Sequence, residues 1–256
     1  MNILCIGDVV SDTGRDHLAR LLRPLKKETG ADLVIVNGEN AALGNGIDRE
    51  SAEDIFNAGA DVITGGNHSF QKKTAGTLLE ETPFLLRPEN LGNTFGRGWC
   101  RVEGRKRDVL IINLQGSLFM PDVQNPFVCV DALLKKEARP RDLIVVDFHA
   151  EATGEKQAMG YYLDGRISLL FGTHTHVQTN DETVLPGGTG YITDIGMTGP
   201  IRSVLGKNID AAVHNFRCPD DRVPVRDAPS PCRLCGILTQ IDDVTGKCIN
   251  ISKISK

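Results

Sequence analysis

The chain has 256 residues, of which 40% are hydrophobic and 24% are charged. This length and composition are typical of one globular α/β domain, so we predict a single domain over residues 1–256. A net charge of −4 gives no electrostatic signature of non-specific binding to DNA or RNA, so we expect no stable nucleic-acid binding, and no apolar run is long enough to predict a membrane-spanning helix.

The first quarter of the chain alternates strand and helix patterns. Apolar runs and recurring leucines predict three strands and two helices, namely strands 2–7, 33–37 and 61–65 and helices 14–28 and 49–58. Either Asp48 or Ser51 is expected to cap the second helix. Such alternation favours βαβ units, and therefore a largely parallel sheet with right-handed crossovers.

Strand patterns dominate after residue 84. Short apolar runs at 84–86, 99–102 and 109–114 predict strands that extend the first sheet or start a second one. The order that follows is a helix at 127–138, a strand at 142–148, a polar segment at 151–166, an apolar run at 168–171 and a Gly-rich loop at 186–190. We expect a closing hairpin, with arms 234–241 and 248–254.

Side chains of the metal-ligand type follow five of the apolar runs. They are Asp8, Glu39 with Asn40, Asn67 with His68, His149, and His174 with His176. Because the carboxyl ends of parallel strands open into one crevice, we expect these side chains to lie together. Mixed oxygen and nitrogen donors suit Mn, Fe or Zn, and this set is larger than one tetrahedral ion needs. The pattern therefore predicts a two-metal hydrolytic centre.

Each cluster also has an ordinary structural interpretation. Asp8 can cap the following helix, and the Glu39–Asn40 and Asn67–His68 segments can simply be polar turns. Asp147 either orients His149 from behind or is a buried, hydrogen-bonded acid. The match of five clusters to five strand ends favours metal binding. We predict Glu39 as the ligand shared by two ions, because a carboxylate can bridge metals about 3.5–4 Å apart.

The remaining histidines and the cysteines carry less information. His17 and His214 lie in helical, charged surroundings and are expected at the surface. The seven cysteines are odd in number and scattered, so we predict no disulfide framework. Free thiols near the closing hairpin are favoured over half of a zinc site at Cys232-x-x-Cys235, for which Cys218 and Cys248 are the other candidates. The chain enters a strand at once, without a signal peptide, which favours the cytoplasm.

In their order, these motifs resemble those of the calcineurin-like metallophosphoesterase family. The corresponding segments are Asp8, Gly38-Glu39-Asn40, Gly66-Asn67-His68, His149 and Gly172-Thr173-His174-Thr175-His176. The first motif lacks the histidine of the usual Asp-x-His, and Gly-Glu-Asn replaces the usual Gly-Asp. Both departures are similar to the YmdB-like branch, as are the opening Gly-Asp-Val-Val and the segment from Thr193 to Pro200.

The resemblance implies a four-layer α-β-β-α sandwich, with mixed sheets inside and helices on the outer faces. It also implies two metal ions, iron or manganese, with zinc as an alternative. One ion would be held by Asp8, Glu39, Asn40 and His176, and the other by Glu39, Asn67, His149 and His174. Asn40 would take the coordination position that the missing histidine leaves.

The activity implied by the resemblance is hydrolysis of cyclic nucleotides, notably 2′,3′-cyclic AMP. A hydroxide bridging the metals would attack phosphorus, while His68 would stabilise the phosphoryl oxygens and protonate the leaving alkoxide. Ser69 stands where the broad family often has an acid, which leaves the orientation of His68 open. Two alternatives remain: a phosphomonoesterase or nucleotidase on the same metal core, and a regulatory protein that senses a cyclic nucleotide with vestigial hydrolysis. A homo-oligomer is compatible with the sequence.

Overall fold

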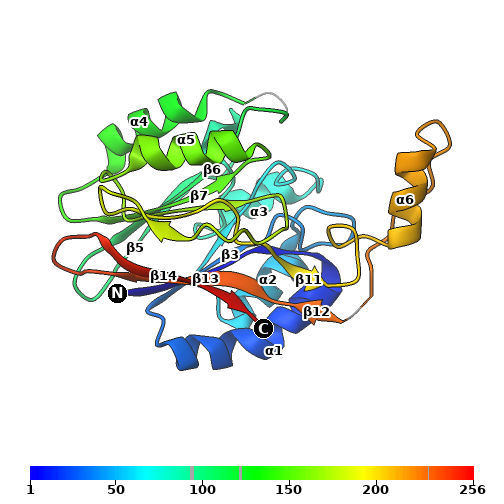
Figure 1. Cartoon of the computed structure of the whole chain (residues 1–256), viewed down its shortest axis with the longest axis horizontal. Coiled ribbons are helices and arrows are strands. Elements are labelled where there is room, and N and C mark those ends of the chain that lie inside the picture. Colours follow the sequence, from blue (N-terminus) through cyan, green and yellow to red (C-terminus); the bar gives the residue numbers. More distant parts are fainter. Residues whose placement is uncertain (93–94, 121–122, 230) are drawn as a thin grey trace.

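Two mixed β-sheets form the centre of the computed structural model, which describes residues 1–92, 95–120, 123–229 and 231–256 (Figure 1). The strands of the first sheet are, in spatial order, β14 (Cys248–Ser255), β13 (Cys235–Ile241), β1 (Asn2–Ile6), β3 (Leu33–Asn37) and β4 (Val62–Thr64). β1, β3 and β4 run parallel to one another, whereas β13 is antiparallel to both of its neighbours. The predicted closing hairpin therefore forms and extends this sheet.

The second sheet has a parallel centre with one antiparallel strand at each edge. Its strands are, in spatial order, β5 (Trp99–Val102), β6 (Val109–Gln115), β7 (Leu143–His149), β8 (Leu169–Thr173), β10 (Gly190–Ile192) and β9 (Thr183–Val184). The runs at 99–102 and 109–114 thus start a second sheet and do not extend the first.

A third, small sheet joins distant parts of the chain. It consists of β12 (Cys232–Arg233), β11 (Met197–Pro200) and β2 (Asp8–Val9). β2 pairs in parallel with β11, so that Asp8 lies opposite Met197. The sequence prediction had no such sheet, because its strands are too short to show a periodic pattern. The pairing anchors Asp8 through its backbone.

Helices cover the outer faces of the two large sheets (Figure 1). The helical elements of the described residues are α1 (Ser11–Thr29), α2 (Arg49–Ala58), α3 (Ala75–Glu81), the 3-10 turn η1 (Glu89–Leu91), α4 (Pro126–Glu137), α5 (Thr153–Leu163) and α6 (Ile209–Arg217), of which α6 covers neither sheet. One hydrophobic cluster lies between α1, α2, α3 and the first sheet, a second between the sheets, and a third between the second sheet and α4 and α5. The predicted α/β class with mixed sheets is confirmed.

Local signals predicted most of the helix and strand positions correctly. Asp48 and Ser51 form a reciprocal capping box at the start of α2, with both backbone nitrogens 2.9 Å from the partner side chain. The predicted strand at 84–86 is wrong, since Leu85 makes only an isolated bridge to Ile63. Pro83 and Pro88 flank this run, and proline has no N–H to continue a ladder.

Helix α5 lies in the segment that the sequence prediction described only as polar. Its buried face carries Glu155 and Lys156 beside Met159 and Leu163, so the apolar spacing that predicts a helix is interrupted. Ser117 donates hydrogen bonds to Glu155 Oε1 from both its backbone nitrogen and its hydroxyl, each at 2.8 Å. The helix was therefore not predicted, because polar residues with hydrogen-bond partners occupy part of its buried face.

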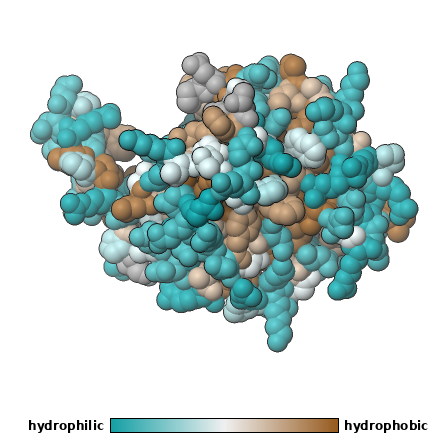
Figure 2. Space-filling view, turned by 180° about the vertical axis from the view of Figure 1, so that it is seen from behind, coloured by the Kyte–Doolittle hydropathy of each residue, from teal (hydrophilic) through white to brown (hydrophobic). Residues whose placement is uncertain are grey.

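Helix α6 stands away from the sheets (Figures 1 and 2). Of its nine residues only Ala212 is buried, and Phe216 is 83% exposed. Over the described part of the chain, no helix combines the length and the apolar character needed to cross a bilayer.

Candidate metal centre

The predicted ligands gather where strands of all three sheets end. Asp8 belongs to β2, Glu39 and Asn40 follow β3, Asn67 and His68 follow β4, His149 is the last residue of β7, and His174 and His176 follow β8. Because β1, β3 and β4 are parallel, as are β7 and β8, their carboxyl ends meet at one edge. The sheet topology thus brings together residues from distant parts of the chain.

One group of ligand atoms comes from Asp8, Glu39 and His176, whose donor atoms all lie within 4.8 Å of one another. Asp8 Oδ1 is 3.8 Å from His176 Nε2. The same oxygen is buried and has no hydrogen-bond partner in the structure. An unpaired buried carboxylate oxygen is costly, whereas a cation would satisfy it. The residues present therefore fit a metal ion.

A second group comes from Glu39, His149 and His174, again with donor atoms within 4.8 Å of one another. His149 Nε2 lies 3.1 Å from both Glu39 Oε2 and His174 Nδ1. Asn67 places Oδ1 3.0 Å from His149 Nε2 and adds a neutral oxygen donor. Glu39 belongs to both groups.

Burial and charge shift the pKa values of these groups strongly. Burial raises the pKa of Asp8 well above its usual value. Burial acts in the same direction on Glu39, but His149 and His68 hold the pKa of Glu39 well below its usual value. Against the effect of burial, Glu39 raises the pKa of His149 to about 9. Burial and the nearby His149 lower the pKa of His174 to about 3, which keeps a lone pair available for a metal.

The residues of the second ligand group can approach one another because position 66 is a glycine. A Cβ atom at this position would lie 2.2 Å from both Glu39 Oε2 and His149 Nε2. No real Cβ contact is that short, so any side chain here would displace Glu39 or His149.

We therefore expect Gly66→Ala to fold but to lose most of its bound metal, as measured by elemental analysis after reconstitution. Gly154→Ala is the matched control, because a Cβ at Gly154 meets nothing within 4 Å. Wild-type metal content in the Gly66 variant would contradict this role of the glycine.

Thr173 and Asp147 orient His149 through hydrogen bonds. The Thr173 hydroxyl donates to Asp147 Oδ1 at 2.7 Å and lies 2.8 Å from His149 Nδ1. Because the hydroxyl proton is used on Asp147, its oxygen accepts from His149 Nδ1–H, which leaves Nε2 for a ligand role. Asp147 also accepts from Asn37 Nδ2 at 3.0 Å. It therefore acts on His149 through Thr173, a residue that the sequence prediction had missed.

Asn40 links the ligand groups to His68. Its Nδ2 lies 2.7 Å from Glu39 Oε1 and 3.2 Å from His176 Nε2, and its Oδ1 lies 3.1 Å from His68 Nδ1. A neighbouring carboxylate favours the amide nitrogen on that side, whereas a cation would favour the oxygen. Turning the amide by 180° exchanges the two atoms without moving any other group. Asn40 is thus placed for a ligand role but presents its nitrogen to the groups.

His68 lies on the wall of a pocket of about 240 Å³ that adjoins the ligand groups. Its side chain is 31% exposed, and its backbone nitrogen donates to Glu39 Oε2 at 3.2 Å. Glu151, Leu205 and Lys207 also line the pocket. A small molecule bound there would contact His68 and the ligand groups together.

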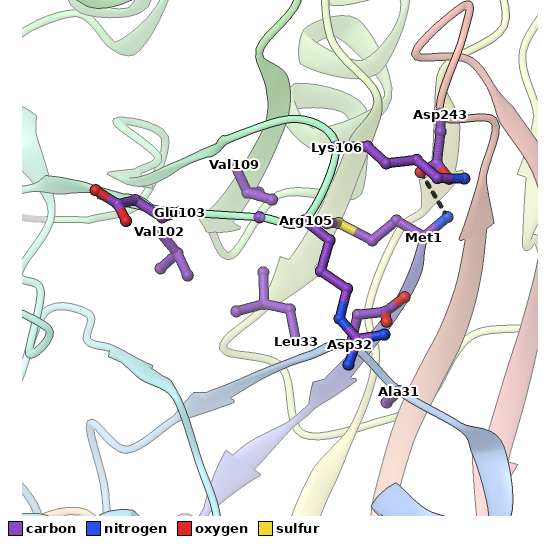
Figure 3. A pocket seen from close by; sticks show the side chains of 11 residues that line it. Met1, Ala31, Asp32, Leu33, Val102, Glu103, Arg105, Lys106, Val109 and Asp243 are labelled. Carbon is purple, nitrogen blue, oxygen red and sulfur yellow. Dashed lines mark hydrogen bonds and ion pairs between the residues drawn. The ribbon is translucent and has the colours of Figure 1, made fainter.

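A pocket larger than the one beside His68 lies at the opposite end of the first sheet, near the start of β1 and β3 (Figure 3). It measures about 450 Å³ and contains the amino group of Met1, Lys106 and Asp243. Asp243 pairs with both cations, at 2.9 Å to the Met1 amino group and 2.8 Å to Lys106. Among the described residues no metal-ligand group lies there, so size does not identify the functional pocket.

The cysteines do not join the site. All seven are free, and neither of the ligand groups found among the described residues contains one. The preference for free thiols over a zinc site at Cys232 and Cys235 stays a prediction.

Solved structures share this architecture over the whole chain. A hypothetical protein from Thermus thermophilus superposes with a TM-score of 0.93 at 37% identity, covering 100% of this chain and 99% of that one. A novel phosphatase from Mycoplasma pneumoniae gives a TM-score of 0.94 at 37% identity, covering 100% and 93%. The NAD nucleotidase of Haemophilus influenzae, at 13% identity and a TM-score of 0.60 over 100% and 55% of the two chains, shares the fold alone.

Fold and site together define a metallophosphoesterase-type hydrolase of phosphoric ester bonds. The chain belongs to the family of YmdB-like proteins, whose family model matches residues 4–254. A protein of Bacillus subtilis (strain 168) named 2′,3′-cyclic-nucleotide 2′-phosphodiesterase is 42% identical over 257 residues, which cover 99% of this chain and 96% of that protein. The resemblance noted from the motifs is confirmed.

Proposed function

We propose that this chain is a two-metal phosphodiesterase that hydrolyses cyclic nucleotides of the 2′,3′-cyclic AMP type. The observation that carries the proposal is the position of Glu39 in both ligand groups, beside a pocket that also contains His68. The name of the Bacillus subtilis relative supports the choice of substrate.

The ligand assignment follows the two groups. Asp8, Glu39, Asn40 and His176 would hold one ion, and Glu39, Asn67, His149 and His174 the other. Iron or manganese suits this mixture of carboxylate, amide and imidazole donors, as does zinc. When bound, the ions supply Lewis-acid charge and lower the pKa of a water molecule towards neutrality.

His68 is the proposed acid for the leaving ribose oxygen. If Asn40 turns its oxygen towards the ligand groups, its amide nitrogen faces His68 Nδ1, which must then accept a hydrogen bond. The proton of the neutral imidazole then resides on Nε2. With Nδ1 held by Asn40, Nε2 carries the hydrogen that can be shared with the leaving ribose oxygen. Asn40 thereby takes the orienting role that an acid at position 69 plays in the broad family.

Lys207 complements the charge of a phosphodiester. Of the described residues that line the pocket, it is the only lysine or arginine. Its ammonium group lies 2.7 Å from Asn45 Oδ1 and 2.6 Å from Asp227 Oδ1, and these contacts hold it in place. We propose that Lys207 attracts the anionic substrate into a pocket that otherwise contains the carboxylates of Glu39 and Glu151.

The deciding experiment is a panel of phosphoesters assayed with the manganese- and iron-reconstituted protein. It should include 2′,3′-cyclic nucleotides, 3′,5′-cyclic nucleotides, nucleoside monophosphates and bis-p-nitrophenyl phosphate. We expect the highest kcat/KM with 2′,3′-cyclic AMP. A preference for monophosphates would instead establish a nucleotidase, and tight binding of cyclic nucleotide without saturable turnover would establish a sensing protein.

A further inference from the structure

A buried ion pair lies beneath the loop that carries two of the histidine ligands. Lys156 Nζ on α5 is 2.7 Å from Asp194 Oδ2, and neither side chain is exposed at all. Asp194 lies between β10 and β11, and neither residue belongs to the ligand groups. Removing two charges from water is costly unless further hydrogen bonds satisfy them. The partners of this pair therefore indicate what it stabilises.

Those partners are backbone and side-chain groups of the histidine loop. Lys156 Nζ donates to the carbonyl oxygen of Thr173 at 2.7 Å. Asp194 Oδ2 accepts from the backbone nitrogen of Thr175 at 3.1 Å and from its hydroxyl at 2.7 Å. The pair thus holds the residue before His174 and the residue after it.

The same carboxylate also reaches the strand of Asp8. Asp194 Oδ1 accepts from the backbone nitrogen of Gly196 at 2.8 Å, and the carbonyl of Gly196 accepts from the backbone nitrogen of Asp8 at 3.1 Å. One buried carboxylate therefore connects the histidine loop with the backbone that places Asp8.

The loop needs such support because its backbone is unusual. His174 has a φ of 95° and His176 a φ of 64°, in the left-handed region that L-residues other than glycine rarely adopt. Strained positions of this kind persist only where the surrounding contacts over-determine them. Thr175 lies between the two histidines and donates two hydrogen bonds to Asp194, one from its backbone nitrogen and one from its hydroxyl.

We propose that the Lys156–Asp194 pair is a positioning device that presents His174 and His176 to two metal ions through Thr175. The inference rests on the proposed function, since it takes the two groups of ligands as metal sites. His176 belongs to one group and His174 to the other, so one anchor serves both. Removing this pair should lower the metal affinity of both sites together. The expected loss is the roughly 10–100-fold that is typical when a residue hydrogen-bonded to a metal ligand is removed.

Thr175→Val and Thr175→Ser form the most direct test. Valine keeps the shape of threonine but removes the hydroxyl donor to Asp194, whereas serine keeps that donor. We expect the valine variant to bind Mn²⁺ at least about 10-fold more weakly in equilibrium dialysis. Hydrogen exchange at residues 173–177 of the metal-free protein should also become faster. The serine variant should behave like the wild type in both measurements.

The ion pair itself is tested by removing both charges at once, with Lys156→Met and Asp194→Leu combined, so that no unpaired charge stays buried. The matched control combines Arg101→Met with Asp142→Leu, because the side chains of that pair are only 12% and 4% exposed and lie away from the ligand groups. Both double variants should unfold at a lower temperature, but only the first should also lose Mn²⁺ affinity.

The outcomes separate this inference from the proposed function. If the wild type binds no Mn²⁺ in the same dialysis, the proposed function fails. If the wild type binds two ions per chain and Thr175→Val binds them equally well with unchanged exchange, the positioning role is overturned. If the Lys156–Asp194 double variant does not fold, the comparison of valine with serine at position 175 decides.

Discussion

His68→Ala should keep both metal ions and yet lose about 10²–10⁴-fold in turnover of 2′,3′-cyclic AMP, the usual contribution of a positioned general acid. The metals should stay because the His68 side chain belongs to neither ligand group. The backbone nitrogen that donates to Glu39 Oε2 is also retained in the alanine variant. The measurement is steady-state kinetics on protein whose metal content is determined in the same sample.

The choice of substrate makes this prediction specific for proton donation. A ribose alkoxide is a poor leaving group and needs a proton, whereas p-nitrophenolate leaves readily without one. The loss on bis-p-nitrophenyl phosphate should therefore be clearly smaller than the loss on 2′,3′-cyclic AMP. His214→Ala, on the exposed helix α6, is the matched control and should change neither rate. Equal losses on both substrates would remove His68 from the acid role and leave it only in charge stabilisation.

Glu39→Gln should lower metal occupancy at both sites at once. Glutamine has the shape of glutamate but lacks the charge, and Glu39 is the one residue common to the two groups identified among the described residues. The side chain is 1% exposed, so water cannot replace the lost carboxylate. Metal affinity should fall by more than the about 10–100-fold that is typical when a residue hydrogen-bonded to a metal ligand is lost. The reason is that Glu39 is itself a proposed ligand. Elemental analysis after dialysis against a fixed Mn²⁺ concentration measures the effect.

Asp8→Asn is the matched comparison for the shared carboxylate. Asp8 belongs to only one of the two groups, so its replacement should remove close to one ion per chain and leave the second. Two fully occupied sites in Glu39→Gln would contradict the bridging assignment. Loss of a single ion in both variants would show that Glu39 serves one site only.

Much of the fold could be predicted from local patterns. β1, β3, β7 and β8 form at the apolar runs, because strands buried on both faces are apolar throughout. The capping box of α2 also forms from neighbouring residues. Helix α5 could not be predicted in this way, since the burial of Lys156 depends on Asp194, 38 residues further along the chain.

The candidate site shows the same division. The types and order of the ligand residues, and their positions after strands, can be predicted because parallel strands end at one edge of a sheet. Thr173 was missed because its role depends on Asp147 and His149, which come from a different strand. The orienting contact between Asn40 and His68 likewise joins residues that follow two different strands.

The sequence alone thus determined which chemical groups are present, and that they follow the apolar strands in the order of a metallophosphoesterase. Only the tertiary structure decided which of the predicted ligands group with Glu39, that β2 pairs with β11 at Asp8, and that a buried ion pair hydrogen-bonds to the histidine loop. The physical reason is distance along the chain. Periodicity and capping depend on neighbours within a few residues, whereas these contacts join residues that only folding brings together.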